Sequence, residues 1–310
     1  MQNIYITEGG RLTEIGTYTP GCWIKLTEPT ADECTLVSER FDVELADVRA
    51  ALDEDESSRV VTEEGYTLIL LDIPTHEVKN IALSYTTIPL GIIIKDDTVI
   101  TVCAKETPVL ADFINQKIRT FSTKKRKRFS CQIIYNNCIV YQNLLRTIDR
   151  KRNEIEEKIN RNMEDSDLIN LHYLESNLVY FATSLRANAS VLDRIKRYGI
   201  LKEHEEDEEL LDDTIIENMQ AIETTKIYQD IIKGTSELFS TVINNRLNVV
   251  MKFLTSITIV MALPTIIAGI WGMNVSLPFE HNQYGFWIVL GITAFACIAM
   301  FIILKKKKML

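Results

Sequence analysis

The sequence has few of the patterns that mark an enzyme or a secreted protein. Its four histidines lie far apart without an H-E-x-x-H motif, and no G-x-x-x-x-G-K-[ST] loop is present. The six cysteines are scattered, with no C-x-x-C pair and no cysteine and histidine cluster at zinc spacing. The chain does not open with the basic and then apolar run of a signal peptide. We therefore expect no enzyme site, reduced cysteines and a cytoplasmic location for roughly the first 250 residues.

Positive charge is also in short supply for binding a nucleic acid. The chain has 34 basic and 43 acidic residues, and its net charge of −9 is carried mainly by the part before about Val249. An acidic surface repels phosphate backbones and attracts cations, so we exclude nucleic acid as a partner. The basic run from Lys124 to Arg128 resembles a nucleic-acid patch only in composition, and we expect a solvated turn between helices there.

Residues 1–125 predict a cytoplasmic α/β domain. Runs rich in Ile, Val, Thr and Tyr alternate with polar turns and predict strands, as in NIYITE, CWIKL, YTLILLDIP, IALSYTTIPLGIIIK and TVITVC. Asp96 and Asp97 predict a hairpin turn, and Thr30 with Glu33 has the pattern of a helix capping box. We expect helices near residues 30–38, 43–52 and 107–120.

From Phe129 onwards, apolar residues recur three or four positions apart, which predicts long helices. We expect residues 126–211 to contain two long helices of the cytoplasmic domain, joined near Asp165 and Ser166. The acidic stretch His204–Glu209 is expected to separate them from a third helical run.

That third run begins near Asp212 and predicts a stalk helix over residues 212–252. No proline interrupts it before Pro264. If one helix continues from Asp212 to Trp271, it spans roughly 90 Å at about 1.5 Å per residue and must enter the membrane from the cytoplasm.

Two uncharged stretches near the C-terminus are long enough to cross a membrane. We assign residues 253–274 to a first transmembrane helix with its terminal motif and residues 285–304 to a second. The outer loop, residues 275–284, contains no Lys or Arg, whereas a basic tail, residues 305–310, follows the second span. By the positive-inside rule we expect a multi-pass protein of the cell membrane with both termini in the cytoplasm.

Two helices enclose no water-filled path, because lipid does not satisfy polar groups. A transporter of this design must therefore assemble from several copies within the lipid bilayer. The first span carries the polar residues Thr255, Ser256, Thr258 and Thr265, whereas the second carries only Thr293. We expect the first span to line a pore and the second to face lipid.

A stripe of residues along the first span is the candidate pore lining. Its members recur three or four positions apart: Thr265, Ala262 (or Met261), Thr258, Leu254, Met251 and Asn248. The alternative is that the hydroxyls only bond carbonyls of their own helix. Leu254 and Met251 form either apolar constrictions that stop ions by dewetting or ordinary packing contacts.

Directly after the first span comes the motif Gly272-Met273-Asn274. At this address, after ALPTIIAGIW and before a span that ends in four lysines, it resembles the signature of the CorA family of Mg²⁺ transporters. The resemblance continues inward through NNRLNVVMKFLTS and, more loosely, to the α/β domain, so it covers nearly the whole chain. It departs at Trp271, where the family commonly has Tyr, and in the loop Leu277–Glu280, which reads Leu-Pro-Phe-Glu rather than Met-Pro-Glu-Leu.

The resemblance implies a funnel-shaped homopentamer with a cytoplasmic α/β mouth, a long helical stalk that continues as the pore wall, and the second span as an outer ring. It implies passive, potential-driven influx of Mg²⁺, with Co²⁺ or Ni²⁺ as further substrates, gated by intracellular Mg²⁺. The ion is then both transported and regulatory.

The chemistry of Mg²⁺ fits a neutral filter, since this ion sheds water reluctantly and prefers oxygen ligands. A ring of Asn274 side chains can accept hydrogen bonds from a hydrated divalent cation and release it again. Gly272 allows the close backbone approach or positive φ needed where the helix ends, and Met273 is expected to pack beneath Asn274. Glu280 in the outer loop is a candidate for attracting cations, with a solvated loop carboxylate as the alternative.

The resemblance places a sensor for intracellular Mg²⁺ between neighbouring subunits. Asp213, at the start of the stalk helix, matches the family position best, and Asp72 or Glu77 is its expected partner. Mg²⁺ that bridges these carboxylates favours a closed state, and its loss loosens the assembly through repulsion. The alternative is that these acidic residues belong to solvated faces.

Two other functions fit the same sequence. A zinc transporter of the same fold also carries Gly-Met-Asn, and competition between metals for uptake separates it from a Mg²⁺ channel. A membrane-anchored sensor without transport predicts that Asn274→Ala leaves activity intact. The polar stripe on the first span favours the channel.

Overall fold

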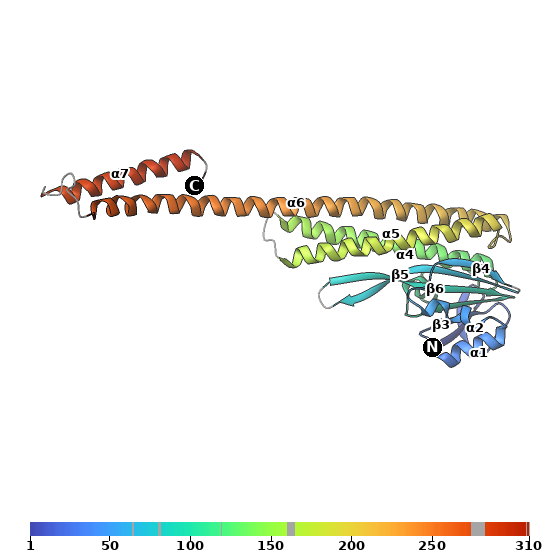
Figure 1. The fold of residues 1–310 in the computed structure, drawn as a ribbon. Helices are drawn as coiled ribbons and strands as arrows, with labels where there is room; N and C mark the ends of the chain where they lie inside the picture. The colour runs from blue at the N-terminus through green and yellow to red at the C-terminus, as the bar shows by residue number, and fades with distance from the viewer. Residues whose placement is uncertain are drawn as a thin grey trace. The chain divides into compact units, whose positions relative to one another are not determined.

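The computed structural model describes residues 1–310 except 64, 80, 81, 119, 160–164, 274–282, 308 and 310. The chain divides into two compact units, Met1–Ser236 and Glu237–Leu310. The first unit contains a sheet and the helices that cover it, and the second consists of helices (Figure 1).

The first unit is built on a single sheet of seven strands. They are β1 (Gln2–Glu8), β2 (Arg11–Ile15), β3 (Trp23–Thr27), β4 (Arg59–Glu63), β5 (Tyr66–Lys79), β6 (Ala82–Lys95) and β7 (Thr98–Cys103). Their order in the sheet is β2-β1-β3-β7-β6-β5-β4, and only β3 and β7 pair in parallel. The central strand β7 is buried along its whole length, in keeping with its apolar sequence. The predicted turn at Asp96 and Asp97 joins β6 to β7.

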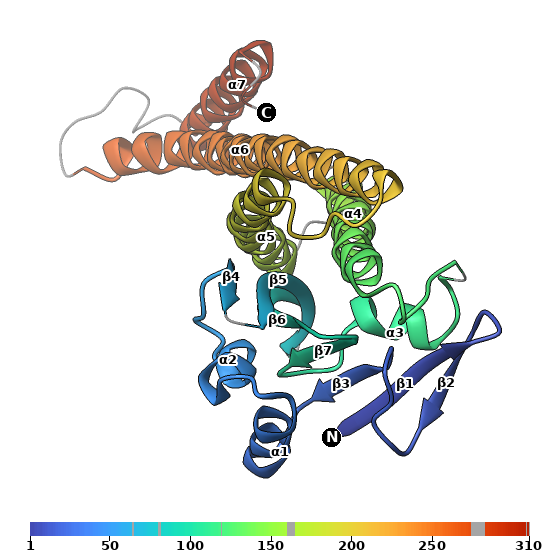
Figure 2. The ribbon, with the colours of Figure 1, turned by 90° about the vertical axis from the view of Figure 1, so that its right-hand side faces the viewer.

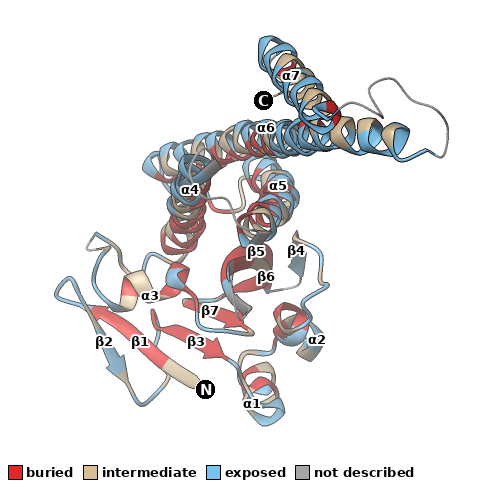
Figure 3. Cartoon of the chain, turned by 90° about the vertical axis from the view of Figure 1, so that its left-hand side faces the viewer, coloured by how far each residue is buried: buried red, intermediate tan, exposed pale blue. Residues whose placement is uncertain are grey.

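Helices cover both faces of this sheet (Figures 2 and 3). They are α1 (Ala31–Phe41), α2 (Leu45–Arg49) and the 3₁₀ turn η1 (Ala50–Leu52) on one face, and α3 (Pro108–Ile114), α4 (Arg126–Ile159) and α5 (Asp165–Tyr198) on the other. Leu68 and Leu70 of β5 pack with α1 and α2, whereas Ile69 and Leu71 pack with α3 to α5. Successive strand residues point to opposite faces, so a strand covered on both sides is apolar throughout. The predicted α/β domain is confirmed.

Local signals for the short helices are also visible in the structure. The Thr30 hydroxyl accepts a bond from the Glu33 N–H, and the Glu33 carboxylate accepts one from the Thr30 N–H, so the predicted capping box is present. The prediction for α3 was too long, because the chain leaves the helix after Ile114 and Gln116 adopts a left-handed φ of 55°.

Beyond their shorter neighbours β4 and β7, the strands β5 and β6 continue as a two-stranded ribbon. Asn188 of α5 makes the hydrogen bonds that a neighbouring strand would make to β5. Its Oδ1 accepts from the Asp72 N–H at 2.9 Å, and its Nδ2 donates to the Asp72 carbonyl at 2.8 Å. On β6, the Oδ1 of Asn177 accepts from the Tyr85 N–H at 3.0 Å. These amides satisfy edge groups that otherwise invite pairing with another strand.

The helices α4, α5 and the first part of α6 (Glu205–Trp271) pack side by side in the first unit (Figure 1). Tyr141 of α4, Phe181 of α5 and Ala221 of α6 share one buried cluster. The two long helices predicted for residues 126–211 are confirmed, and α5 begins at Asp165, where the joint was predicted.

The predicted start of the third helix was wrong, because α6 begins at Glu205 and not at Asp212. The acidic stretch that we expected to be a separator forms the first turns of this helix. Carboxylates are stabilised near a helix N-terminus by the helix dipole. Asp207 Oδ2 also accepts from the His204 N–H at 2.9 Å, and its Oδ1 lies 3.2 Å from Nη1 of Arg128 on α4.

The basic run Lys124–Arg128 was predicted to be a turn, and only part of it is one. Lys124 and Lys125 lie in a turn, but Arg126 to Arg128 form the start of α4. Arg128 pairs with Glu206 and Asp207 in the acidic start of α6.

The second unit contains the end of α6 and the following helix α7 (Gly285–Lys306). Each carries a stretch that is long and apolar enough to cross a membrane. Only 6% of either stretch is buried inside the protein, which separates both from the core helix of a soluble protein. The end of α6 at Trp271 and the position of α7 agree with the predicted spans.

Asn188→Ala should lower the thermal stability of the detergent-solubilised protein. The substitution leaves the part-buried N–H of Asp72 without its acceptor, and the loss of such a hydrogen bond costs about 1 kcal/mol. Ser190→Ala is the matched control, since that exposed hydroxyl donates to the Arg186 carbonyl of its own helix. Equal melting temperatures for the two variants would contradict the role of Asn188 at the strand edge.

Candidate functional site

The candidate pathway residues lie on and just after the last part of α6. Leu254, Thr258, Ala262 and Thr265 belong to the uncharged run Phe253–Trp271, Asn248 and Met251 precede it, and Gly272 to Asn274 follow it. A helix satisfies its own backbone groups, which lipid does not. The threonine hydroxyls also bond within the helix: Thr258 Oγ1 donates to the Leu254 carbonyl at 2.9 Å, and Thr265 Oγ1 donates to the Met261 carbonyl at 3.2 Å. The sequence left open that these hydroxyls only bond carbonyls of their own helix, and both make such bonds. Each hydroxyl oxygen still has lone pairs that can accept a hydrogen bond from water.

One face of this part of α6 is covered by α7, which runs back alongside it (Figure 1). Ser256 Oγ lies 2.7 Å from the Lys252 carbonyl oxygen of its own helix and 3.1 Å from the Met309 carbonyl oxygen just after α7, and Cys297 Sγ of α7 lies 3.8 Å from the Val260 carbonyl oxygen. The buried and half-buried positions of α6 between residues 256 and 267 recur at three or four residues: Ser256, Ile259, Val260, Leu263, Pro264 and Ile267.

The predicted pore stripe lies on the opposite face of α6. At 3.6 residues per turn, the centre of the stripe falls about half a turn from the face that α7 covers. All six members are exposed in the single chain: Asn248, Met251, Leu254, Thr258, Ala262 and Thr265. The apolar members Met251 and Leu254 are 51% and 56% exposed, respectively. The structure therefore gathers the stripe on one uncovered face, and its part in conduction stays a prediction.

The end of α6 shows why glycine suits position 272. The Gly272 N–H donates to the Ala268 carbonyl at 2.9 Å, and a Cβ on Gly272 would lie 3.2 Å from that same oxygen. The sequence offered two reasons for glycine here, a positive φ and a close backbone approach. The φ of Gly272 is not positive, so the close approach is the reason that applies. The Met273 side chain is 56% exposed among the described residues, and its predicted packing beneath Asn274 stays a prediction. Asn274 and Glu280 lie outside the described residues.

The three predicted regulatory carboxylates are not brought together in the described part of a single chain. Asp213 is exposed on α6. Asp72 is half-buried on β5, and burial raises the pKa of its carboxyl, although hydrogen bonds from Ser184 and Ser58 oppose this effect. Glu77 lies on β5, but its side chain is outside the described residues. No group of three His, Cys, Asp or Glu side chains among the described residues is placed to hold a metal ion.

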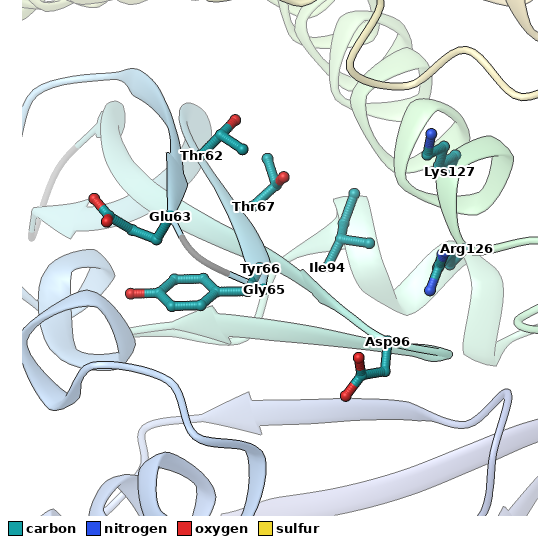
Figure 4. A pocket seen from close by; sticks show the side chains of 9 residues that line it. All are labelled: Thr62, Glu63, Gly65, Tyr66, Thr67, Ile94, Asp96, Arg126 and Lys127. Atoms are coloured by element: carbon teal, nitrogen blue, oxygen red, sulfur yellow. The ribbon is translucent and has the colours of Figure 1, made fainter.

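A surface hollow in the first unit lies apart from these residues (Figure 4). It is lined by Thr62, Glu63, Gly65, Tyr66, Thr67, Ile94, Asp96, Arg126 and Lys127. The Tyr66 hydroxyl donates to Asp47 at 2.6 Å, and Arg126 lies 3.7 Å from Asp97. These lining residues mix both charges and pair no nucleophile with a general base, so they offer no basis for an enzyme site.

The contacts between α6 and α7 were not foreseen from the sequence. Ser256 belongs to the polar set of the span predicted to line the pore, but it is buried and its hydroxyl lies within hydrogen-bond distance of the Met309 carbonyl after α7. Its helical spacing to Ile259 and Val260, two apolar residues, was the available signal. Pro264 was the available signal for the Cys297 contact. It leaves the Val260 carbonyl, four residues earlier, without its helical donor, so a donor from another segment can be expected there.

Comparison with known proteins gives consistent matches over most of the chain. Residues 20–306 match the profile of the CorA-like Mg²⁺ transporter protein family. The chain is 29% identical over 279 residues to the cobalt/magnesium transport protein CorA of Methanocaldococcus jannaschii, covering 87% of this chain and 85% of that protein. It is 26% identical over 294 residues to the protein of the same name from Thermotoga maritima, covering 93% and 83%.

The fold has the same relatives. The complete structure of the CorA magnesium transporter from Methanocaldococcus jannaschii matches with a TM-score of 0.82 at 25% identity, covering 98% of this chain and 96% of that one. Full-length CmaX matches with a TM-score of 0.71 at 16% identity, covering 98% and 97%, which shows a shared fold alone. Because the family profile matches nearly the whole chain, from the α/β domain through both candidate spans, this protein belongs to the family of CorA-like Mg²⁺ transporters.

Proposed function

We propose that this protein is a homopentameric channel of the cell membrane that admits Mg²⁺, and also Co²⁺ or Ni²⁺, under the control of intracellular Mg²⁺. Membership of the family supports Mg²⁺ transport, and two relatives are named cobalt/magnesium transport proteins. Two helices able to span the membrane support the location, with both termini in the cytoplasm as the distribution of basic residues predicts.

The observation that carries this proposal is the uncovered face of α6 opposite α7. Asn248, Thr258 and Thr265 lie on that face, and exposure of such polar side chains to lipid is unfavourable. Several copies that turn this face inward would enclose a polar path and leave the apolar α7 towards lipid. Met251 and Leu254 would then form apolar rings on the cytoplasmic side of Thr258, where dewetting can stop ions.

Selection in this proposal falls to Gly272, Met273 and Asn274. A neutral amide ring at Asn274 holds a hydrated ion by hydrogen bonds to its water, so the ion keeps its shell and leaves readily. Glu280 raises the local concentration of cations at the outer mouth. The membrane potential supplies about 4.6 kcal/mol per 100 mV for a divalent cation, twice the value for one charge.

Asn274→Ala should reduce Mg²⁺ uptake into liposomes under an imposed potential by about tenfold or more, while the oligomer stays intact. Loss of the outer-sphere hydrogen bonds removes at least about 1.4 kcal/mol of ion stabilisation at the filter, which corresponds to that factor. Initial rates of uptake and the mass of the solubilised oligomer are the two measurements. Gln283→Ala removes an exposed amide just before α7 and should transport like the wild type.

Three outcomes would count against this proposal. Wild-type rates in Asn274→Ala would favour a tethered sensor, and a protein that stays monomeric in lipid would have no path. Uptake of Zn²⁺ that ignores competing Mg²⁺ would favour the zinc transporter of the same fold.

For regulation we propose that Mg²⁺ binds between Asp213 and a carboxylate of the neighbouring copy's α/β domain, Asp72 or Glu77. Asp213 supports this assignment because it is exposed and lies on the same helix that carries the pore stripe. Glu217 stands one helical turn further on and adds negative charge nearby. Bound Mg²⁺ relieves the repulsion between these carboxylates and so favours the closed assembly.

Asp213→Lys should weaken the protection from proteolysis that Mg²⁺ confers, because the new ammonium repels the ion. The fragment pattern of the full-length oligomer is measured against Mg²⁺ concentration, and the midpoint should move upwards. Glu223→Lys, the same charge reversal at another exposed position of α6, should leave the midpoint in place. An unchanged midpoint in Asp213→Lys would remove this residue from the sensor.

Asp72→Asn should raise the melting temperature at pH 7 in Mg²⁺-free buffer. Burial raises the folded-state pKa of Asp72 above the ordinary value of 3.8, so its favourable contribution is complete below that value and is lost as pH rises through the raised pKa. The advantage of the variant should therefore shrink as pH falls towards 4. A lower melting temperature for the variant at pH 7 would contradict this reading of Asp72.

A further inference from the structure

Pro264 interrupts the hydrogen bonding of α6 inside its apolar stretch. Proline has no backbone N–H, so the carbonyl of Val260, four residues earlier, lacks its regular i→i−4 helical hydrogen bond. In water such a carbonyl finds a solvent partner, but in a lipid environment a freed backbone group must be satisfied from within the protein. Val260 and Pro264 both lie on the half-buried face that α7 covers, so its partner must come from α7.

Cys297 of α7 supplies that partner. Its Sγ lies 3.8 Å from the Val260 carbonyl oxygen, within the range of a thiol donor. The thiol is a weak donor, yet it is half-buried and stands between the two helices. The proline and the cysteine are far apart in the sequence but act on the same carbonyl. Pro264 removes its helical donor, and the Cys297 thiol donates to it instead.

The neighbouring hydroxyls are directed elsewhere. Thr265, next to the proline, donates to the Met261 carbonyl of its own helix. Thr293, one turn before Cys297 on α7, donates to the Val289 carbonyl at 2.8 Å. Among the described contacts, only the cysteine bridges from α7 to this carbonyl.

We propose that Cys297 is a positioning residue for the transport pathway, because it closes the carbonyl that Pro264 leaves open and so holds α6 against α7 at that level. The part of α6 beyond the proline leads to Thr265 and then to Gly272, Met273 and Asn274. Without the thiol, the Val260 carbonyl stays unpaired or takes a water molecule, and water inserted at such a point loosens or bends a helix. This inference rests on the proposed function for its effect on transport, but its structural part does not.

A double-mutant cycle on the full-length oligomer in liposomes tests the pairing. Cys297→Ala should lower the melting temperature by about 2–4 °C and reduce the initial rate of Mg²⁺ uptake. Cys297→Ser keeps a donor and should retain both properties better than Cys297→Ala. In the Pro264→Ala background the restored N–H satisfies Val260, so Cys297→Ala should cause no further loss of stability.

Controls separate this effect from simple loss of packing. Thr293→Ala removes a donor from α7 that bonds its own helix, and it should shift the melting temperature less than Cys297→Ala. If Pro264→Ala fails to assemble, Cys297→Val decides: it fills the space without a donor, so it should resemble Cys297→Ala and not Cys297→Ser.

Two results would overturn the inference: additive losses in the cycle, or Cys297→Ser no better than Cys297→Ala. Failure of the proposed function looks different, because the wild type would then pass no Mg²⁺ although the coupling in stability between residues 264 and 297 persisted.

Discussion

In the hydrocarbon of a membrane, each polar group must find its partner within the protein, and this constraint governs the second unit. It requires the last part of α6 and α7 to be helical throughout, so that the backbone bonds itself. It directs the hydroxyls of Thr258 and Thr265 back to their own helix. It also makes the proline in α6 unfavourable unless a neighbour donates, and α7 brings Cys297 to that carbonyl.

The same constraint links the helix faces to the mechanism. With α7 on one side of α6, the uncovered side carries Asn248, Thr258 and Thr265 among apolar residues. The two threonine hydroxyls bond their own helix, and in the proposed assembly copies that turn this face inward would place the remaining lone pairs and the Asn248 amide beside water. Conduction by a hydrated ion then needs no tight ligands, which agrees with a neutral amide in the motif after the span.

The first unit, Met1–Ser236, also pairs its polar groups within the protein. The strands β5 and β6 extend beyond β4 and β7. There, Asn188 and Asn177 of α5 form hydrogen bonds with backbone groups of Asp72 and Tyr85. At the start of α6, Asp207 bonds the His204 N–H and pairs with Arg128 of α4. Both contacts join segments distant in sequence, and a helix that begins in this unit is continuous to Trp271 in the other.

Hydropathy and helical spacing are local properties of a chain, so the α/β domain, the two candidate spans and the position of Gly272-Met273-Asn274 after the first span could be predicted without the fold. The sequence misplaced the start of α6, since Glu205 to Glu209 look like a linker until Arg128 is beside them. The fold was needed to show that Ser256 lies near the tail after α7, that Asp72 is half-buried and that Cys297 contacts the Val260 carbonyl. Each of these depends on which distant segment packs on a given face, and no local pattern specifies that partner.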